Sequence, residues 1–482
     1  MNFRAVFHLV SFLPLVLGLS MLVCWLVGAY MGDPWEARRG FALSAALSMV
    51  LGSMLWTFTR GSVDLNRRDG VGIVTFGWFT ATLLGAAPFM LTGVIPDFAG
   101  AWFESVSGFT TTGASVLSNL EELPRSILLW RAVTHLLGGM GILVLCVAIL
   151  PLLGSGGMQI YRAEAAGPSK DRLTPRIANT AKLLWGVYAG LNLLMFGLLW
   201  LQGLSVFDAI CHAFATIATG GFSTRSTSIA AFQSPGIEWT ITIFMFISGI
   251  NFALHWRLLR GEWRVWLRDS ELKLFVLIIG AALLLIGLNA GPAFYNDAAT
   301  AIRGICFTVV SIITTTGYST DDYILWPALS QYILVLLMFI GGCAGSTAGG
   351  IKVIRVLVLF KQVAREMKLF IQPQAIYHVK VGRQLVDTEI VSMISAFLII
   401  FILIFVIASG LMMFFVPDLK TSVSAVASAL GNVGPGLGDV GPMGNYAFIP
   451  ATGKIILSHC MLLGRLELYT MLVILFPAFW RR

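Results

Sequence analysis

One stretch of the sequence, residues 102–116, reads WFESVSGFTTTGASV. A short apolar run is followed there by hydroxyl residues and a glycine, and three later stretches share this order. They read FDAICHAFATIATGGFST at 207–224, AIRGICFTVVSIITTTGYST at 301–320 and SVSAVASALGNVGPGLG at 422–438. Aligning Gly113, Gly220, Gly317 and Gly434 places one copy roughly every 100 residues, which predicts four internal repeats.

The composition places these repeats in a membrane. The chain has 482 residues, of which 57% are hydrophobic and 12% charged, and its mean hydropathy is +0.84. A soluble domain carries about 25% charged residues, and a disordered chain has low hydrophobicity. We therefore predict an all-α polytopic membrane protein with ten crossings of roughly 20 or more residues. They fall at about 5–31, 40–59, 71–95, 127–153, 183–203, 237–258, 272–292, 327–360 (interrupted), 389–416 and 452–478.

The basic residues predict the orientation. Ten crossings place both termini on one side, and most Lys and Arg residues fall on that side, including those within 352–383. Most acidic residues fall on the other side. Cytoplasmic loops are enriched in Lys and Arg, so both termini are expected in the cytoplasm. The net charge of +8 thus reflects topology rather than nucleic-acid binding, which needs a basic face on a soluble module.

Each repeated stretch is too short to span the membrane. A helix rises 1.5 Å per residue and the hydrocarbon core is roughly 30 Å thick, so each short helix must enter and return on one side. Non-helical backbone is tolerated at that depth only inside protein or along an aqueous path. Four such loops around one axis can replace the water shell of a monovalent cation with carbonyl oxygens. One TTTG could be a helix end without function, but four copies in phase favour a pore.

The repeats also predict the organisation of the chain. Two helices in residues 1–69 precede four M1–P-loop–M2 units around a central pore. These units are expected at 70–180, 181–270, 271–387 and 388–482. In the fourth copy Asn432 and Val433 replace the threonine pair and Pro435 follows the glycine, so the pore is expected to be only pseudo-fourfold.

The segments GFTTTGA, TIATGGFST, TTTGYST and LGNVGPGLG resemble the four pore loops of the Trk/Ktr/HKT potassium transporter superfamily. The two additional N-terminal crossings resemble its bacterial TrkH/TrkG branch. The resemblance implies a homodimeric K⁺ uptake subunit of the bacterial inner membrane that binds a cytosolic nucleotide-binding ring of the TrkA type. It implies bound K⁺ ions and no covalent cofactor. The implied filter is Thr111, Thr112, Gly113, Ala218, Thr219, Gly220, Thr315, Thr316, Gly317, Asn432, Val433 and Gly434; a one-residue shift would include Thr110, Ile217 and Thr314.

A run of small residues, GGCAGSTAGG at 341–350, interrupts the eighth crossing. Close helix packing could explain Gly341, Gly345 and Gly349 alone, but the other small residues favour a break in the helix. The resemblance implies that this segment is a mobile gate beneath the filter. Its members would be Gly341, Gly342, Gly345, Ser346, Thr347, Gly349 and Gly350.

Arg465 lies inside the last predicted crossing, where a charge is costly and usually faces a partner or a cavity. Glu467 is two residues away and cannot pair with Arg465 within one helix. The arginine therefore needs a partner elsewhere, either an acid in a buried ion pair or the pore itself. The resemblance implies an electrostatic barrier or a part of the gate.

Two other classes of protein would leave different sequence patterns. A secondary transporter of another cation or a small solute would show inverted repeats and intramembrane acids. A membrane enzyme would need a titratable cluster at one depth. Four repeats of one orientation with few buried acids favour a K⁺-permeating pore, whether channel-like or coupled to H⁺ or Na⁺. The inner segments 154–182 and 361–388 could each dock a cytosolic partner or be solvated loops.

Overall fold

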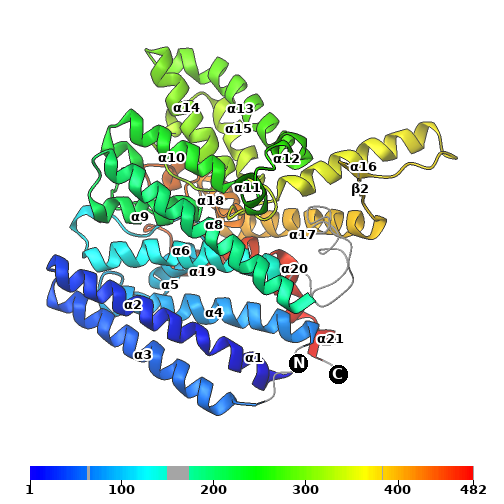
Figure 1. Cartoon of the computed structure of the whole chain (residues 1–482). Helices are drawn as coiled ribbons and strands as arrows, with labels where there is room; N and C mark the ends of the chain where they lie inside the picture. Colours follow the sequence, from blue (N-terminus) through cyan, green and yellow to red (C-terminus); the bar gives the residue numbers. More distant parts are fainter. Residues whose placement is uncertain (62–65, 149–172, 383, 481–482) are drawn as a thin grey trace.

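The computed structural model describes residues 1–61, 66–148, 173–382 and 384–480, and within them the chain is a bundle of long and short helices (Figure 1). The N-terminal part is a helical hairpin that lies beside α4. Its members are α1 (Phe3–Val10), α2 (Phe12–Met31) and α3 (Trp35–Thr59). Asp33 lies in the turn between α2 and α3, and its carboxylate accepts hydrogen bonds from the N–H groups of Arg125 and Ser126, both at 2.8 Å. That contact fixes the hairpin to the start of α6.

Four units of related design follow. Unit one holds α4 (Arg67–Leu91), α5 (Phe98–Phe109), η1 (Leu120–Glu122) and α6 (Arg125–Ala148). Unit two holds α8 (Leu173–Leu201), α9 (Val206–Ile217), η3 (Ser228–Phe232), α10 (Pro235–Ser248), α11 (Phe252–Leu259) and α12 (Arg264–Arg268). Unit three holds α13 (Ser270–Phe294), α14 (Ala298–Ile313), η4 (Tyr323–Leu325), α15 (Ala328–Phe339) and α16 (Val353–Ile371). Unit four holds α17 (Thr388–Met412), α18 (Leu419–Gly431), η5 (Gly438–Val440), α19 (Ala451–Arg465), α20 (Leu468–Leu472), η6 (Val473–Leu475) and α21 (Pro477–Trp480).

The four short helices α5, α9, α14 and α18 begin in the same way. Each has an Asp or Ser N-cap whose side-chain oxygen accepts from the backbone N–H three residues later, which satisfies one of the unpaired donors of the first turn. The caps are Asp97, Ser205, Asp297 and Asp418. The helices contain 12, 12, 16 and 13 residues. Even the longest rises only about 24 Å, which is less than the hydrocarbon thickness.

Within the described residues, six helices are long and apolar enough to cross a membrane, or eight if each bent helix pair is one span. The ten predicted crossings add α6, which has 24 residues, and the interrupted pair α15 and α16. The last residues of the fourth predicted crossing, 149–153, lie outside the described residues. Helix α8 already begins at Leu173, ahead of the predicted unit boundary at 180, because hydropathy marks only the apolar part of a helix.

Two predicted continuous crossings are in fact bent. The crossing expected at 237–258 consists of α10 and α11, which meet at 100°, and the one expected at 452–478 consists of α19 and the α20 segment, which meet at 116°. The reason at the first bend is a new helix start, because the side chain of Asn251 accepts from Ala253 N and caps α11. Three of the four units therefore break their second long helix.

The apolar core divides into two halves. One half is formed mainly by units two and three, with Phe275 and Phe307 fully buried. The other is formed by the N-terminal hairpin and units one and four, with Phe103 and Trp130 fully buried. The chain ends meet at one end of the bundle, where the rings of Phe3 and Trp480 stack 5.9 Å apart (Figure 1). Both termini therefore lie on one side, as an even number of crossings requires.

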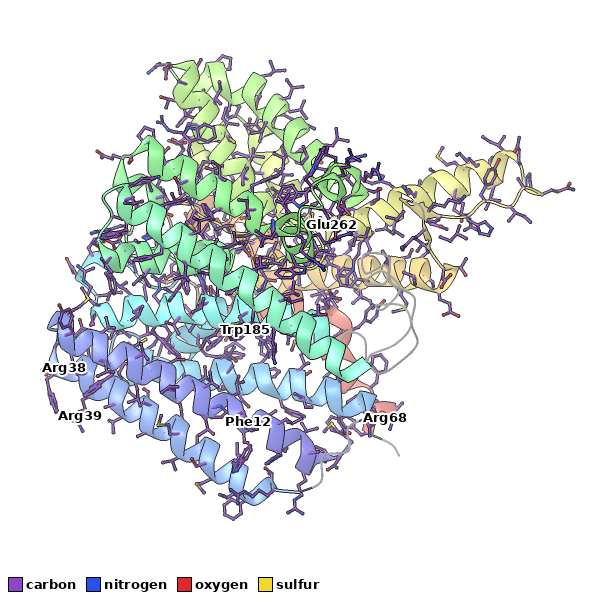
Figure 2. All side chains as sticks on the ribbon, in the orientation of Figure 1. Phe12, Arg38, Arg39, Arg68, Trp185 and Glu262 are labelled. Carbon is purple, nitrogen blue, oxygen red and sulfur yellow. The ribbon has the colours of Figure 1, made fainter. Side chains whose placement is uncertain are left out.

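Figure 2 shows Arg38 and Arg39 at the end of the bundle opposite Arg68. Helix α16 projects away from the bundle (Figure 1), and a small hairpin of β1 (Lys380–Val381) and β2 (Gln384–Leu385) follows it. This hairpin is a minor departure from the all-α prediction. It is held by a local cluster in which Val358 of α16 and Val379 pack with Ile394 of α17.

Candidate ion pathway

The backbone turns in the same way at the end of each short helix. Thr111, Thr219, Thr315 and Asn432 all have φ between 52° and 56°. The N–H of the next residue donates to the carbonyl five positions back, as in a Schellman helix end. These bonds run from Thr112 to Ser107 (2.9 Å), Gly220 to Ala215 (2.8 Å), Thr316 to Ser311 (2.9 Å) and Val433 to Ser428 (2.9 Å). We call the segments that follow loops 1 to 4, beginning at Thr110, Ala218, Thr314 and Asn432.

This geometry corrects the predicted alignment in loop 2. The glycines with positive φ directly after the turn are Gly113, Gly221, Gly317 and Gly434, with φ of 85°, 78°, 77° and 107°. Gly220, aligned with them by sequence, is instead the counterpart of Thr112 and Thr316. Ala218 occupies the position of Thr110 and Thr314. Loop 2 contains two consecutive glycines, so sequence alone could not tell which one has the left-handed backbone.

Gly220 must be small for a different reason. A Cβ there would lie 2.3 Å from Nδ1 of His135, whose fully buried ring stacks on Phe222 at 4.2 Å. The hydroxyls of Thr110 and Thr314 each donate to a helix carbonyl, Val106 O and Val310 O, both at 2.7 Å. Each of these two hydroxyls is therefore hydrogen-bonded to a carbonyl of the short helix that precedes it.

The four loops close a ring, which we call the glycine ring and define as Gly113, Gly221, Gly317 and Gly434. A Cβ placed at each glycine would meet the carbonyl oxygen of the next loop, in the order 1, 2, 3, 4 and back to 1. Each distance joins the added Cβ to the carbonyl oxygen: 2.2 Å from Gly113 to Gly220 O, 1.9 Å from Gly221 to Thr316 O, 2.0 Å from Gly317 to Val433 O and 2.6 Å from Gly434 to Thr112 O. Carbonyls of four loops thus meet around one centre, and only glycine leaves room for them.

A polar cavity of about 280 Å³ opens onto this ring and includes all four ring glycines in its lining. Serine follows the ring glycine by two positions in three loops, at Ser115, Ser223 and Ser319, and each lines the cavity. Hydroxyls and carbonyls therefore line the entrance to the ring.

The predicted break in the eighth crossing is confirmed. Helix α15 ends at Phe339 and α16 begins at Val353, and we call residues 340–352 the small-residue loop. Its two ends are bonded together, since Gly341 N donates to Ile351 O at 3.0 Å and Ile351 N to Phe339 O at 2.9 Å. A Cβ at Gly341 would lie 1.8 Å from Gly349 O, so the closed loop requires its small residues.

The small-residue loop packs against the helix-side end of the glycine ring. Gly349 N donates to the Thr315 hydroxyl at 2.7 Å, and the Thr347 hydroxyl donates to Ile217 O at 2.9 Å. A Cβ at Gly349 would also meet Asn432 Cβ at 2.7 Å. The loop thus contacts the ends of three short helices. Gly342, Gly345, Ser346 and Gly350 belong to the same segment, and Gly345 and Gly350 have positive φ.

Arg465 lies beneath the same loop. Its side chain is nearly fully buried, and Nη1 donates to Thr347 O at 2.6 Å. Glu467 pairs instead with Arg355 at the start of α16, so the prediction that Glu467 does not pair with Arg465 is confirmed. Arg465 thus contacts the small-residue loop through a backbone carbonyl.

Of the acids buried in the described residues, two that contact the small-residue loop or loop 1 were not predicted from the sequence. Glu271 of α13 accepts from Ala344 N at 2.7 Å and from Ile354 N at 2.9 Å, one on each side of the loop tip. Glu104 of α5 is fully buried and pairs with Arg131 at 2.9 Å. Glu104 was recognisable as a charge in an apolar helix, whereas Glu271 lies at the predicted end of a crossing, where acids are ordinary.

These features define a polytopic helical membrane protein whose four repeats converge on one ring. A family described as TrkH, cation transport protein, matches residues 37–481, so the chain belongs to this family of cation transporters, which are not enzymes. The chain is 42% identical to the Trk system potassium uptake protein TrkH of Escherichia coli strain K12, with both chains fully covered. It is 34% identical to the Trk system potassium uptake protein TrkG of the same strain, over 99% of each chain.

The fold has a solved counterpart. The crystal structure of the potassium transporter TrkH from Vibrio parahaemolyticus matches with a TM-score of 0.91 and 37% identity, covering all of both chains. The predicted family and the all-α polytopic fold class are thereby confirmed.

Proposed function

We propose that this chain carries K⁺ into the bacterial cell across the inner membrane, with the glycine ring as its selectivity filter. The observation that carries the proposal is the closed succession of glycine and carbonyl around four loops. Carbonyl oxygens that converge on one line can replace the hydration shell of K⁺. The names of the relatives, potassium uptake proteins and a potassium transporter, agree with this substrate.

The filter would consist of the loop residues at and just before the ring. These are Thr111, Thr112 and Gly113, then Thr219, Gly220 and Gly221, then Thr315, Thr316 and Gly317, and then Asn432, Val433 and Gly434. No covalent cofactor is required. The K⁺ ions are cargo, bound transiently by backbone oxygens.

The small-residue loop would be the gate. Its contacts with Thr315, Ile217 and Asn432 support this role, because an ion that leaves the ring toward the cytoplasm would meet the loop there. Arg465 would hold the loop in this closed position through Thr347 O and add a positive charge below the filter. An ion could pass once the loop moves aside.

Regulation would come from other chains. We propose a homodimer that binds a cytosolic nucleotide-binding ring of the TrkA type, with both termini in the cytoplasm. Helix α16 leads directly from the gate and projects from the bundle, so a partner bound there could displace the loop. The second segment predicted to dock a partner, 154–182, lies largely outside the described residues.

The test is reconstitution into K⁺-loaded vesicles with uptake of Rb⁺ and of Na⁺ measured separately. We expect Rb⁺ uptake to exceed Na⁺ uptake, and we expect Gly317→Ser to reduce this preference. Gly280→Ser is the matched control, because nothing lies within 4 Å of a Cβ at Gly280. Saturable uptake of an organic solute without cation flux would contradict the proposal.

A further inference from the structure

A second layer of polar contacts lies behind the glycine ring, on its outer side. In repeats one and two the residue seven positions before the turn contacts the residue four positions after it. In repeat one, Ser115 Oγ donates to Glu104 Oε1 at 2.9 Å, and in repeat two His212 Nε2 and Ser223 Oγ lie 3.0 Å apart. Each contact ties the chain beyond the glycine to its own short helix.

Repeat three uses a different side chain for this tie. The equivalent pair is Thr308 and Ser319, and the hydroxyls of both are buried with no hydrogen-bond partner among the described residues. The hydroxyl of Ser311 donates instead to Tyr318 O at 2.7 Å.

Repeat four also uses a serine of its short helix. The equivalent pair is Ala425 and Gly436, which have no polar side chain. The hydroxyl of Ser424 donates instead to Leu437 O at 3.1 Å and accepts from Leu437 N at 2.8 Å. The four corners of the glycine ring are therefore supported by different groups.

Arg131 of α6 adds a contact that crosses between loops. Its Nε donates to Glu104 at 2.9 Å, Nη2 to Ser115 Oγ at 3.3 Å, and Nη1 to the carbonyl of Ser223 in loop 2 at 2.9 Å. The guanidinium also lies 4.0 Å from the ring centre of Phe222. The guanidinium of Arg131 thus joins loops 1 and 2 just outside the glycine ring.

The other boundaries between neighbouring loops are closed by neutral donors. The hydroxyl of Tyr318 donates to Phe222 O at 3.2 Å, the hydroxyl of Tyr323 to Gly436 O at 3.1 Å, and Tyr446 N to Ser115 O at 2.8 Å. Among these four contacts, the one between loops 1 and 2 alone uses a charged side chain.

Burying this ion pair has a large unfavourable desolvation free energy. The side chains of Arg131 and Glu104 are 3% and 0% exposed, and two charges taken out of water repay their desolvation only with near-ideal geometry. An apolar pair of similar size would often stabilise a fold equally well. The geometry obtained with the charges, a planar fork reaching two loops at once, is one that apolar residues cannot provide.

We infer that Glu104 and Arg131 are positioning residues for cation selection. They hold loops 1 and 2 at a fixed separation and so set the width of the outer end of the glycine ring. This inference rests on the proposed function. Neither side chain needs to touch the ion, because both act through the hydroxyl of Ser115, and Arg131 acts also through the carbonyl of Ser223.

The test compares Arg131→Lys and Glu104→Gln with wild type in the same vesicles. Lysine keeps the charge beside Glu104 but lacks the planar fork that reaches both loops. We expect the ratio of Rb⁺ to Na⁺ uptake to fall roughly threefold to tenfold in both variants, as the loss of one charged hydrogen bond in the filter support would produce. Rb⁺ uptake itself should remain measurable.

The matched controls are Arg303→Lys and Glu238→Gln. Arg303 and Glu238 also form a partly buried ion pair between helices, at 2.7 Å, but within the described residues neither side chain forms a hydrogen bond with a carbonyl of the glycine ring. Both controls should keep the wild-type uptake ratio.

Thermal unfolding in detergent distinguishes a variant that does not fold from a folded variant that has lost its preference for Rb⁺ over Na⁺. If either single variant does not fold, the uncharged pair Glu104→Gln with Arg131→Gln replaces it, because that pair leaves no lone buried charge.

A wild-type ratio in folded Arg131→Lys, or in the uncharged pair, would overturn the inference while leaving the proposed function intact. A wild-type protein without preference for Rb⁺ over Na⁺ would instead refute the proposed function. An equal fall in ratio in the Arg303 and Glu238 controls would also overturn the inference, because any ion pair would then have the same effect.

Discussion

At the residue scale, the ring glycines meet two separate requirements. Each has a positive φ, and each leaves space for a carbonyl of the next loop. Gly203, in the turn before α9, meets only the first, because its φ is 97° and nothing lies within 4 Å of a Cβ there. The two requirements can therefore be tested apart.

We expect Gly221→Ala to abolish most Rb⁺ uptake, and Gly203→Ala to leave it nearly unchanged. Gly203→Ala should lose about 1–2 kcal/mol of stability, because alanine disfavours the left-handed backbone, and Gly221→Ala should lose more, because its methyl group also clashes with a backbone oxygen. Only the methyl group at Gly221 would displace a ring carbonyl, that of Thr316. Thermal unfolding and vesicle uptake measure the two effects, and equal losses of uptake would show that backbone strain alone matters.

Much of the ring was predictable from the sequence. The TTTG of loops 1 and 3 gave the correct turn and glycine, and Asn432 was aligned correctly although it replaces a threonine. The error at Gly220 arose because ATGG offers two glycines, and choosing between them depends on φ and on the space occupied by His135. The φ angle and the space beside each glycine depend on tertiary contacts, so the local sequence does not predict them.

At the scale of elements, the small-residue loop and the α10–α11 bend hold each other. Cys343 N donates to Gly249 O at 2.8 Å, and Phe252 N donates to Gly345 O at 3.0 Å. The sequence predicted the loop from ten consecutive small residues. Each of the two bends, by contrast, contains a single glycine beside polar or charged residues, in SGIN at 248–251 and in GRLEL at 464–468. A bend whose freed backbone groups are satisfied by another element leaves little local trace.

Glu271 anchors this arrangement, and its substitutions should separate hydrogen bonding from charge. Glu271→Leu leaves the N–H groups of Ala344 and Ile354 without their acceptor, at a cost of about 1–3 kcal/mol for each group. We expect lower stability and greater Rb⁺ leak without a regulatory partner. Glu271→Gln keeps an oxygen in place and should resemble wild type. Unfolding temperature and basal uptake test this expectation, and a tightly closed Glu271→Leu protein would contradict it.

At the scale of the whole molecule, the contact of Phe3 with Trp480 brings the chain ends together, while Ser118 lies at the cavity above the ring. Composition and charge sufficed to predict the class and an even number of crossings. They could not predict how units two and three, and units one and four, share separate halves of the core, since that division depends on packing across the ring.

The orientation can be tested in intact cells by adding one cysteine at a time to the wild-type chain. A membrane-impermeant thiol reagent added outside should label Ser118→Cys and not Lys368→Cys on α16, because the positive-inside rule places α16 in the cytoplasm. Permeabilised cells should label both. Wild type reports the background from native cysteines, and external labelling of Lys368→Cys would reverse the proposed orientation.

Because all four loops belong to one polypeptide, the glycine ring has a genetic consequence. In an assembly of four identical chains, one altered codon appears at every corner at once. Here a codon change alters a single corner and leaves three as they were, so the ring can diverge stepwise. Asn432, which occupies the position of a threonine in the other three loops, is a difference confined to one corner in this way.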